Sequence, residues 1–259
     1  MIQKDFANRA VSILNKNESV IGLAAGGSWI TNELDEFSDL DLIVVTVDKI
    51  SDQITKMKEI ADSLGDLLSA FTGEHVGEPR LLICLYENPL LHVDLKFLTL
   101  NEFHVRVENP VILLDKKNLL ASSFKKSDPK FPYPDYQWIE DRIWTWIHYA
   151  LTKIGRGEYL EAHDFLASLR MMVFGPLLHI KKSSLPRGVR KLESILDEDE
   201  INELRKTLST YNRNDLLKSL RNAVNLYKQL RTSLFDETIQ LQEATERAVM
   251  NYFDQLEKD

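Results

Sequence analysis

The sequence predicts an α/β (α+β) domain with a mixed sheet, followed by an all-α helical bundle, and three observations carry this prediction. Short apolar runs rich in β-branched residues, each bounded by turn residues, recur in the first half of the chain. In the second half, apolar residues recur at the three- and four-residue spacing of amphipathic helices. A polar stretch over residues 122–136, with three of the eight prolines, suits an interdomain connection. We therefore expect one domain over residues 1–125 and another over residues 126–259.

In the first half, helical spacing of apolar residues alternates with runs that resemble strands. The expected elements are a helix over residues 5–16, strands over 20–24 and 40–46, a helix whose apolar stripe runs from Ile54 to Leu68, a hairpin of strands 80–86 and 90–98, and an edge strand over 110–115. The hairpin is expected to turn at Glu87, Asn88 and Pro89, because proline and asparagine favour turns.

Beyond the connection, every apolar pattern has the period of a helix. Long helices are expected over residues 138–154 and 160–173, the first closed by glycines and the second kinked or stopped before Pro176. Further helices are expected over residues 198–210, 215–234 and 241–256.

Composition and charge narrow the class of protein. The chain has 259 residues, 44% of them hydrophobic, and a single cysteine, Cys84, so no intrachain disulfide can form and a reducing compartment fits best. No segment approaches the roughly 20 apolar residues that cross a bilayer, and the opening residues lack the apolar core of a secretion signal. We therefore expect a cytoplasmic protein with no membrane partner. The net charge of −8 argues against long nucleic acids and favours a small-molecule partner.

Two carboxylates lie at the start of the second expected strand, in the run SDLDLIVV. Asp39 and Asp41 are two residues apart, so on an extended strand both project from one face while Leu40 faces the other way. Magnesium in proteins typically takes a few fixed carboxylates and completes its shell with water and substrate phosphates. The spacing therefore predicts a Mg²⁺ site. The alternative is a polar outer face of a half-exposed strand.

A glycine-rich turn precedes this strand. Gly26 and Gly27 allow the backbone to turn tightly, and Ser28 stands where a short helix could begin, so free N–H groups there would meet an anion. The ten residues between Ser28 and Asp39 allow the turn and the carboxylates to lie at the same end of neighbouring strands. We expect Gly27 and Ser28 to bind a phosphate, although Ser28 could instead simply cap the helix.

A third carboxylate, Asp94, alternates with apolar residues in the run HVDLKF. If its strand pairs beside residues 40–46, the three carboxylates Asp39, Asp41 and Asp94 converge on metal, with two ions stabilising the attacking oxygen and the leaving group together. The alternative is a surface residue of the hairpin, or a salt-bridge partner of Lys96 on the same face.

Together the three motifs resemble the nucleotidyltransferase superfamily to which DNA polymerase beta belongs. Its signature of a Gly-Ser turn, an Asp-x-Asp strand and a third acidic strand is matched in order by Gly27-Ser28, Asp39-Leu40-Asp41 and Asp94. The resemblance implies a magnesium-dependent transfer from ATP or another nucleoside triphosphate. Residues 138–162 also resemble the Trp-rich helices of bacterial aminoglycoside and lincosamide nucleotidyltransferases, which implies these antibiotics as candidate acceptors beside an unknown metabolite.

The acceptor hydroxyl needs a general base, and the candidate is Glu140, early in the first helix after the connection. Asp141 is its immediate rival, Asp94 could also serve, and a solvated helix face explains Glu140 and Asp141 equally well. Three tryptophans and three cationic residues are further candidates for contact with the substrate. The tryptophans are more often core residues, and Lys and Arg side chains are usually solvated. The candidates are Trp138, Trp144, Trp146, Lys96, Arg156 and Arg170.

The sequence therefore predicts an enzyme that transfers a nucleoside monophosphate to a hydroxyl of a small acceptor, in a cleft between the two domains. Two alternatives stay open: a nucleotidyltransferase that modifies a protein or an RNA, and a non-catalytic nucleotide sensor with the same fold. The acceptor, the preferred base of the nucleotide and the oligomeric state do not follow from the sequence.

Overall fold

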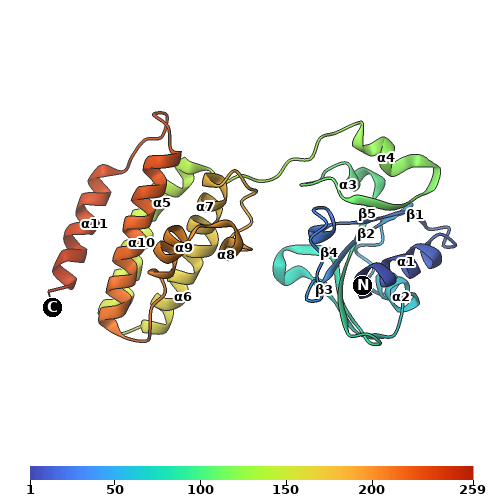
Figure 1. Ribbon diagram of the computed structural model, residues 1–259, viewed down its shortest axis with the longest axis horizontal. Helices are drawn as coiled ribbons and strands as arrows, with labels where there is room; N and C mark the ends of the chain where they lie inside the picture. The colour runs from blue at the N-terminus through green and yellow to red at the C-terminus, as the bar shows by residue number, and fades with distance from the viewer. Residues whose placement is uncertain (259) are drawn as a thin grey trace. The chain divides into compact units, whose positions relative to one another are not determined.

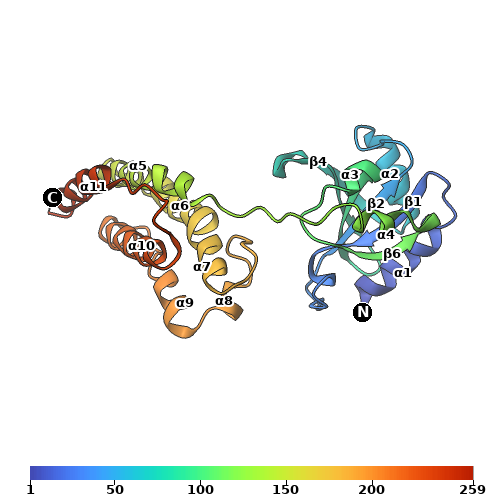
Figure 2. The same cartoon turned by 90° about the horizontal axis from the view of Figure 1, so that it is seen from above.

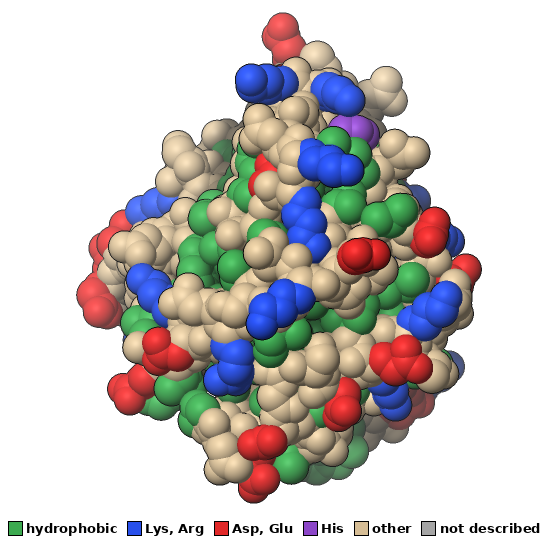
Figure 3. All heavy atoms as spheres, turned by 90° about the vertical axis from the view of Figure 1, so that its right-hand side faces the viewer, with side chains coloured by type: hydrophobic (Ala, Val, Ile, Leu, Met, Phe, Trp, Pro, Cys, Tyr) green, Lys and Arg blue, Asp and Glu red, His purple; other side chains and the backbone are tan. Residues whose placement is uncertain are grey.

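The computed structural model describes residues 1–258. The chain forms two compact units, Met1–Phe131 and Pro132–Asp259, which Figures 1 and 2 show from two directions. No helix among the described residues combines the length and the apolar character needed to span a membrane. On the face seen in Figure 3, Lys and Arg side chains are interspersed with Asp and Glu side chains around apolar areas.

The first unit is built on a six-stranded mixed sheet with the strand order β3-β4-β5-β2-β1-β6. Neighbouring strands are antiparallel except for β2 and β5, which are parallel. The strands are β1 (Val20–Ala25), β2 (Leu40–Thr46), β3 (Leu67–Gly73), β4 (Glu78–Tyr86), β5 (Leu91–Thr99) and β6 (Val111–Asp115). The mixed sheet and the predicted hairpin of β4 and β5 are thereby confirmed.

Four helices cover the two faces of this sheet unequally. Helices α1 (Ile2–Leu14) and α2 (Ile54–Ser63) lie on one side, and the short helices α3 (Leu100–Phe103) and α4 (Leu119–Phe124) lie on the other (Figure 1). Leu40, Leu42 and Val44 of β2 are buried in the core that α1 and α2 share with the sheet. Because side chains alternate along a strand, the residues between them project from the opposite face. That face is the one that carries the candidate site.

One expected helix is too long, and one strand was missed. Helix α2 ends at Ser63, and Leu67 and Leu68 belong to β3, which pairs with β4 at the edge of the sheet. Leu67 and Leu68 continue the helical apolar spacing of Ile54–Leu64 by coincidence, so periodicity alone extended the helix. The turn at Gly65 and Asp66, which separates the two elements, was the signal against that extension.

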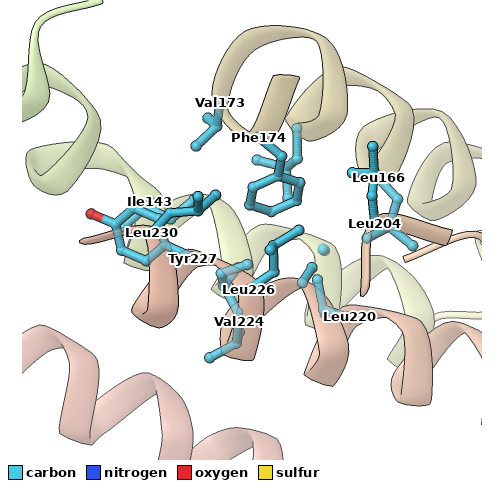
Figure 4. Packing of buried hydrophobic residues seen from close by; sticks show 14 of the residues in the cluster. Ile143, Leu166, Val173, Phe174, Leu204, Leu220, Val224, Leu226, Tyr227 and Leu230 are labelled. Carbon is cyan, nitrogen blue, oxygen red and sulfur yellow. The ribbon is translucent and has the colours of Figure 1, made fainter. Parts of the chain in front are cut away.

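The second unit is all-helical, as predicted. Its helices are α5 (Tyr136–Gly155), α6 (Tyr159–Leu169), α7 (Gly175–Lys181), α8 (Leu192–Ile195), α9 (Glu198–Arg205), α10 (Arg213–Leu234) and α11 (Glu243–Leu256). Figure 4 shows Ile143 of α5, Leu226 of α10 and Phe174, which precedes α7, among the side chains that fill its core. The predicted helix does not stop before Pro176: a π-helical segment, Arg170–Phe174, joins α6 to α7, and Pro176 lies in the first turn of α7.

Candidate functional site

The glycine turn lies directly against the strand that carries the first carboxylates. β1 ends at Ala25, and a short 3₁₀ helix, Gly27–Trp29, follows at once. The backbone N–H of Gly26 donates to the carbonyl oxygen of Asp41 at 2.9 Å, which continues the pairing of β1 with β2 into the turn. The N–H of Trp29 makes the first bond of the 3₁₀ helix, to Gly26. The N–H groups of Gly27 and Ser28 precede it, as donors that an anion would meet.

Both the backbone conformation and the neighbouring side chain at position 27 require a glycine. Its φ of +55° lies in the left-handed region, which favours glycine, and a Cβ built there would lie 2.0 Å from Oδ2 of Asp41. The carboxylate of Asp41 therefore lies over the turn, in space that only a residue without a side chain leaves open. This contact joins the predicted phosphate turn to the predicted metal ligand.

The pairing of β2 with β5 brings two of the three carboxylates together. In the parallel register Asp41 stands opposite Asp94, and Leu40 opposite Val93. Both acidic residues are half-buried and project from the face opposite the core of α1 and α2. The sequence left open whether these two strands are neighbours, and the structure shows that they are. Asp39 lies one residue before β2 and is also half-buried.

Asp94 has a partner that the sequence reasoning missed. Nε2 of His92 lies 3.0 Å from Oδ1 of Asp94, and the two side chains are 47% and 21% exposed. None of the six histidines has the sequence spacing of a metal site, so that criterion does not single out His92. Its two-residue separation from Asp94 on one strand was the signal, since such residues share a face.

The donor chemistry of this face fits magnesium. Carboxylate oxygens are hard ligands, and a magnesium site needs only one or two of them because water and substrate phosphates supply the rest. Asp41 and Asp94 meet that requirement as a cross-strand pair, with the glycine turn beside them. Among residues 1–258, no three His, Cys, Asp or Glu side chains are grouped closely enough to form a metal centre from protein ligands alone. Convergence of Asp39 with the other two acids stays a prediction.

Lys96, two residues beyond Asp94 on the same face, belongs to a chain of ion pairs. Its Nζ lies 2.7 Å from Oε2 of Glu78, and Nε of Arg80 lies 2.7 Å from Oε1 of the same carboxylate. The hydrogen bond from Arg80 lowers the pKa of Glu78 most strongly, and the bond from Lys96 lowers it further. Burial raises this pKa in part, and the net result is a pKa of about 2. Arg80 also reaches Glu102 at 3.6 Å, so two cations face two anions.

The prediction of Glu140 as the general base is wrong. Its side chain is completely buried inside the helical unit. Trp144 Nε1 donates to it at 3.1 Å, the backbone N–H of Gln242 at 3.0 Å, and the Tyr227 hydroxyl also donates to it. Arg231 Nη1 lies 3.4 Å away. Burial, together with the bond to Glu140, raises the pKa of Tyr227 above its usual range. A base must reach the proton of a substrate hydroxyl, and this carboxylate is enclosed by its own donors.

Replacing Glu140 with alanine is expected to destabilise the protein by about 3 kcal/mol, because Arg231 and the buried donors lose their common acceptor. Urea denaturation measures this loss, and Glu140→Gln should lose less because it keeps an oxygen acceptor. The transfer rate per folded molecule should stay within about twofold of wild type, as for substitutions remote from chemistry. A large fall in that rate with unchanged stability would restore a catalytic role.

The remaining candidates divide between core and surface. Trp144 is 1% exposed and belongs to the core, as favoured from the sequence, whereas Trp138 is 42% exposed and meets Trp146 edge-on at 5.4 Å. Arg170 donates to the carbonyl oxygen of Thr207 at 2.8 Å, which is a structural bond within the helical unit. Arg156 is exposed and pairs with Glu158.

A protein-family model matches nearly the whole chain. The model of the streptomycin adenylyltransferase family matches residues 2–256. Among solved structures, the chain is similar to an aminoglycoside 6-adenyltransferase from Bacillus subtilis, with 18% identity, 98% of each chain covered and a TM-score of 0.40. It is also similar to a nucleotidyltransferase-like protein from Exiguobacterium sibiricum, with 12% identity, 99% of this chain and 89% of that chain covered, and a TM-score of 0.36. No curated protein matches the chain.

Proposed function

Because this chain belongs to the streptomycin adenylyltransferase family and is therefore a nucleotidyltransferase, we propose that it transfers a nucleoside monophosphate to a hydroxyl of an aminoglycoside antibiotic. ATP is the proposed donor and streptomycin the first acceptor to consider. The observation that supports the proposal best is the position of Asp41, which stands opposite Asp94 and over Gly27 of the glycine turn. The proposed phosphate-binding turn and the proposed metal ligands Asp41 and Asp94 therefore lie next to each other.

Each residue of the site has a proposed part in the transfer. The turn at Gly27 and Ser28 binds the phosphates through its N–H groups and the Ser28 hydroxyl. Asp39, Asp41 and Asp94 are the proposed ligands of two Mg²⁺ ions, which when bound offset the charge of the phosphates. Asp94 is also the proposed general base now that Glu140 is known to be buried, with His92 fixing the orientation of its carboxylate.

In this reaction the acceptor oxygen forms a bond to the α-phosphorus while the bond from that phosphorus to the bridging oxygen breaks. Pyrophosphate leaves, and the hydroxyl proton passes to Asp94. Most of the rate enhancement then comes from positioning and from charge stabilisation, as is general for transfer at phosphorus.

The alternatives raised by the sequence fare differently. Membership of an adenylyltransferase family makes the chain an enzyme, which is against a non-catalytic sensor. A protein or RNA acceptor has no observation in its favour, and the net charge of −8 is unfavourable for RNA. A small-molecule acceptor is therefore the proposal we carry forward.

Mass spectrometry of the reaction products tests the function. The protein is incubated with Mg²⁺, each nucleoside triphosphate in turn, and a panel containing streptomycin, other aminoglycosides and lincosamides. A product heavier by one adenosine monophosphate, formed from ATP and an aminoglycoside, is the expected result. A nucleotide adduct found only on a protein, or only on a lincosamide, would replace the proposed acceptor.

Removal of divalent metal is expected to abolish transfer, because two adjacent carboxylates and a triphosphate repel each other without it. Activity is measured after treatment with a chelator and after addition of excess Mg²⁺ or Ca²⁺. Magnesium should restore the rate, whereas calcium, which is larger and takes more ligands, should restore little. Undiminished transfer in the chelator would refute the role proposed for the three carboxylates.

A further inference from the structure

A hollow of about 600 Å³ opens on the sheet face that carries the acidic pair, and apart from the glycine turn at its edge none of the roles above uses it. Its size falls within the range of small-molecule sites. The residues that line it come from the glycine turn, from β2, β4 and β5, and from two segments beyond the sheet. They include Gly26, Gly27, Ile43, Leu98, Phe103 and Lys96.

The hollow is continuous with the proposed catalytic groups. Gly26 and Gly27 of the phosphate turn form part of its lining. Ile43 follows Asp41 by two residues on β2, and Lys96 follows Asp94 by two residues on β5, so both pairs share a face at a separation of roughly 6.6 Å along the strands. A nucleotide whose phosphates lie at the turn would therefore have the rest of the molecule within reach of this hollow.

Its lining suits a nucleoside better than a phosphate. The floor is apolar, with Phe103 and Leu98 only 1% and 6% exposed. The charged groups on one side, Lys96 and Arg80, are already paired with Glu78. A polyanion would have to disrupt these pairs, whereas a flat base needs an apolar surface and neutral polar groups at its edge.

One wall of the hollow is formed by the residues that lead toward the helical unit, and Arg106 holds that wall in place. Arg106 Nη1 donates to Ser127 Oγ at 2.8 Å, and its Nη2 donates to the Ser127 carbonyl oxygen. The N–H of Lys130 donates to the carbonyl oxygen of Arg106 at 2.9 Å. The guanidinium also stacks on the ring of Phe124 at 4.7 Å. Ser127, Asp128 and Lys130 line the hollow because of these bonds.

We propose that this hollow binds the base and ribose of the donor nucleotide, and that Arg106 is a positioning residue that builds its outer wall from residues 127–130. The inference rests on the proposed function, since it assumes a nucleotide donor. It adds that nucleotide binding strengthens the order of residues 125–131, at the end of the first unit. Lysines at 125, 126 and 130 lie there, so trypsin reports on that order.

The test compares wild type with Arg106→Lys, which keeps the charge but loses the forked donors. A matched control is Arg9→Lys on the other face of the sheet, where Arg9 likewise donates to a carbonyl oxygen, that of Leu64, and lies over a ring, that of Phe6. Calorimetry measures the Kd of a non-hydrolysable ATP analogue with Mg²⁺. Trypsin cleavage after residues 126 and 130 is timed with and without the analogue.

At about ten times the wild-type Kd, the analogue should slow cleavage of wild type and of Arg9→Lys about tenfold. Arg106→Lys should raise the Kd about tenfold, as for one lost charge-assisted hydrogen bond, and should retain about twofold protection. If Arg106 had only a structural role, Arg106→Lys would speed cleavage by the same factor with and without the analogue. As a second variant, Ile43→Phe fills the floor and should weaken analogue binding with little change in melting temperature.

The other outcomes overturn the inference in distinguishable ways. If the analogue binds wild type but does not slow cleavage, the hollow is not the nucleoside site, and the proposed function stands. If Arg106→Lys raises the KM of the acceptor and leaves the Kd of the analogue unchanged, the hollow belongs to the acceptor. If wild type binds no nucleotide, the proposed function fails and the inference fails with it.

Discussion

Replacement of Asp41 by asparagine is expected to lower the rate of nucleotidyl transfer by about a thousandfold or more, the scale on which loss of a central charge-stabilising group acts. Asparagine keeps the shape of the side chain but removes the charge that would hold Mg²⁺ against the phosphates. The fold should survive, because the side chain projects from the open face of β2 and the backbone bond from Gly26 is unaffected. Transfer is measured by product formation, and folding by circular dichroism and thermal melting.

The control for this variant is Asp52→Asn, which removes the same charge from an exposed position in the same unit. It should transfer at the wild-type rate, so that a loss in Asp41→Asn can be assigned to position and not to net charge. Turnover by Asp41→Asn at the wild-type rate would remove the basis of the proposed mechanism.

Substitution of Gly27 by alanine should have the second largest effect. The new Cβ would lie 2.0 Å from Oδ2 of Asp41. An alanine held at the φ of +55° that Gly27 adopts would also add backbone strain of about 1 kcal/mol. The carboxylate and the turn must then move apart. We expect kcat/KM to fall about a hundredfold, since a displacement of roughly 1 Å in a positioned site has an effect of this size. Steady-state kinetics with varied nucleotide concentration measures it.

Gly77→Ala is the matched control, because Gly77 also has a positive φ, +77°, but a Cβ there meets nothing within 4 Å. It should carry a similar strain and lose stability by about 1 kcal/mol, with kcat/KM unchanged. If the two alanine variants show equal activity, the close approach of Gly27 to Asp41 does not contribute to catalysis.

Local patterns in the sequence were sufficient to predict most strands of the sheet. β2 begins with an alternation of acidic and apolar residues, and its apolar members are buried where that alternation predicts. What the sequence did not contain was the neighbour of each strand. The parallel pairing of β2 with β5 joins residues about fifty positions apart, and only this pairing brings Asp41 and Asp94 together.

Glu140 shows why a local pattern misled. It lies four residues before Trp144 on α5, and its position on the helix belongs to the buried stripe. A carboxylate there normally indicates solvent exposure, unless partners from elsewhere satisfy it. Those partners, Tyr227 and Arg231, come from α10, so the burial of Glu140 depends on contacts that no window of the sequence contains.

The wall of the hollow was unpredictable for a related reason. Residues 122–136 read as a connection because of their prolines and charges, and nothing in that run indicates contact with the sheet unit. Arg106 provides that contact through bonds to Ser127, about twenty residues away. Arginines are mostly solvated in proteins, so no local pattern singles out Arg106.

The most direct test of the central claim, that Asp39, Asp41 and Asp94 bind divalent metal beside the glycine turn, is anomalous X-ray scattering from crystals containing Mn²⁺ and a non-hydrolysable ATP analogue. Manganese takes the same oxygen ligands as magnesium and can be located by its signal. The account predicts metal peaks in contact with these carboxylates and with the phosphates of the analogue. An ordered nucleotide whose metal lies away from all three carboxylates would contradict it.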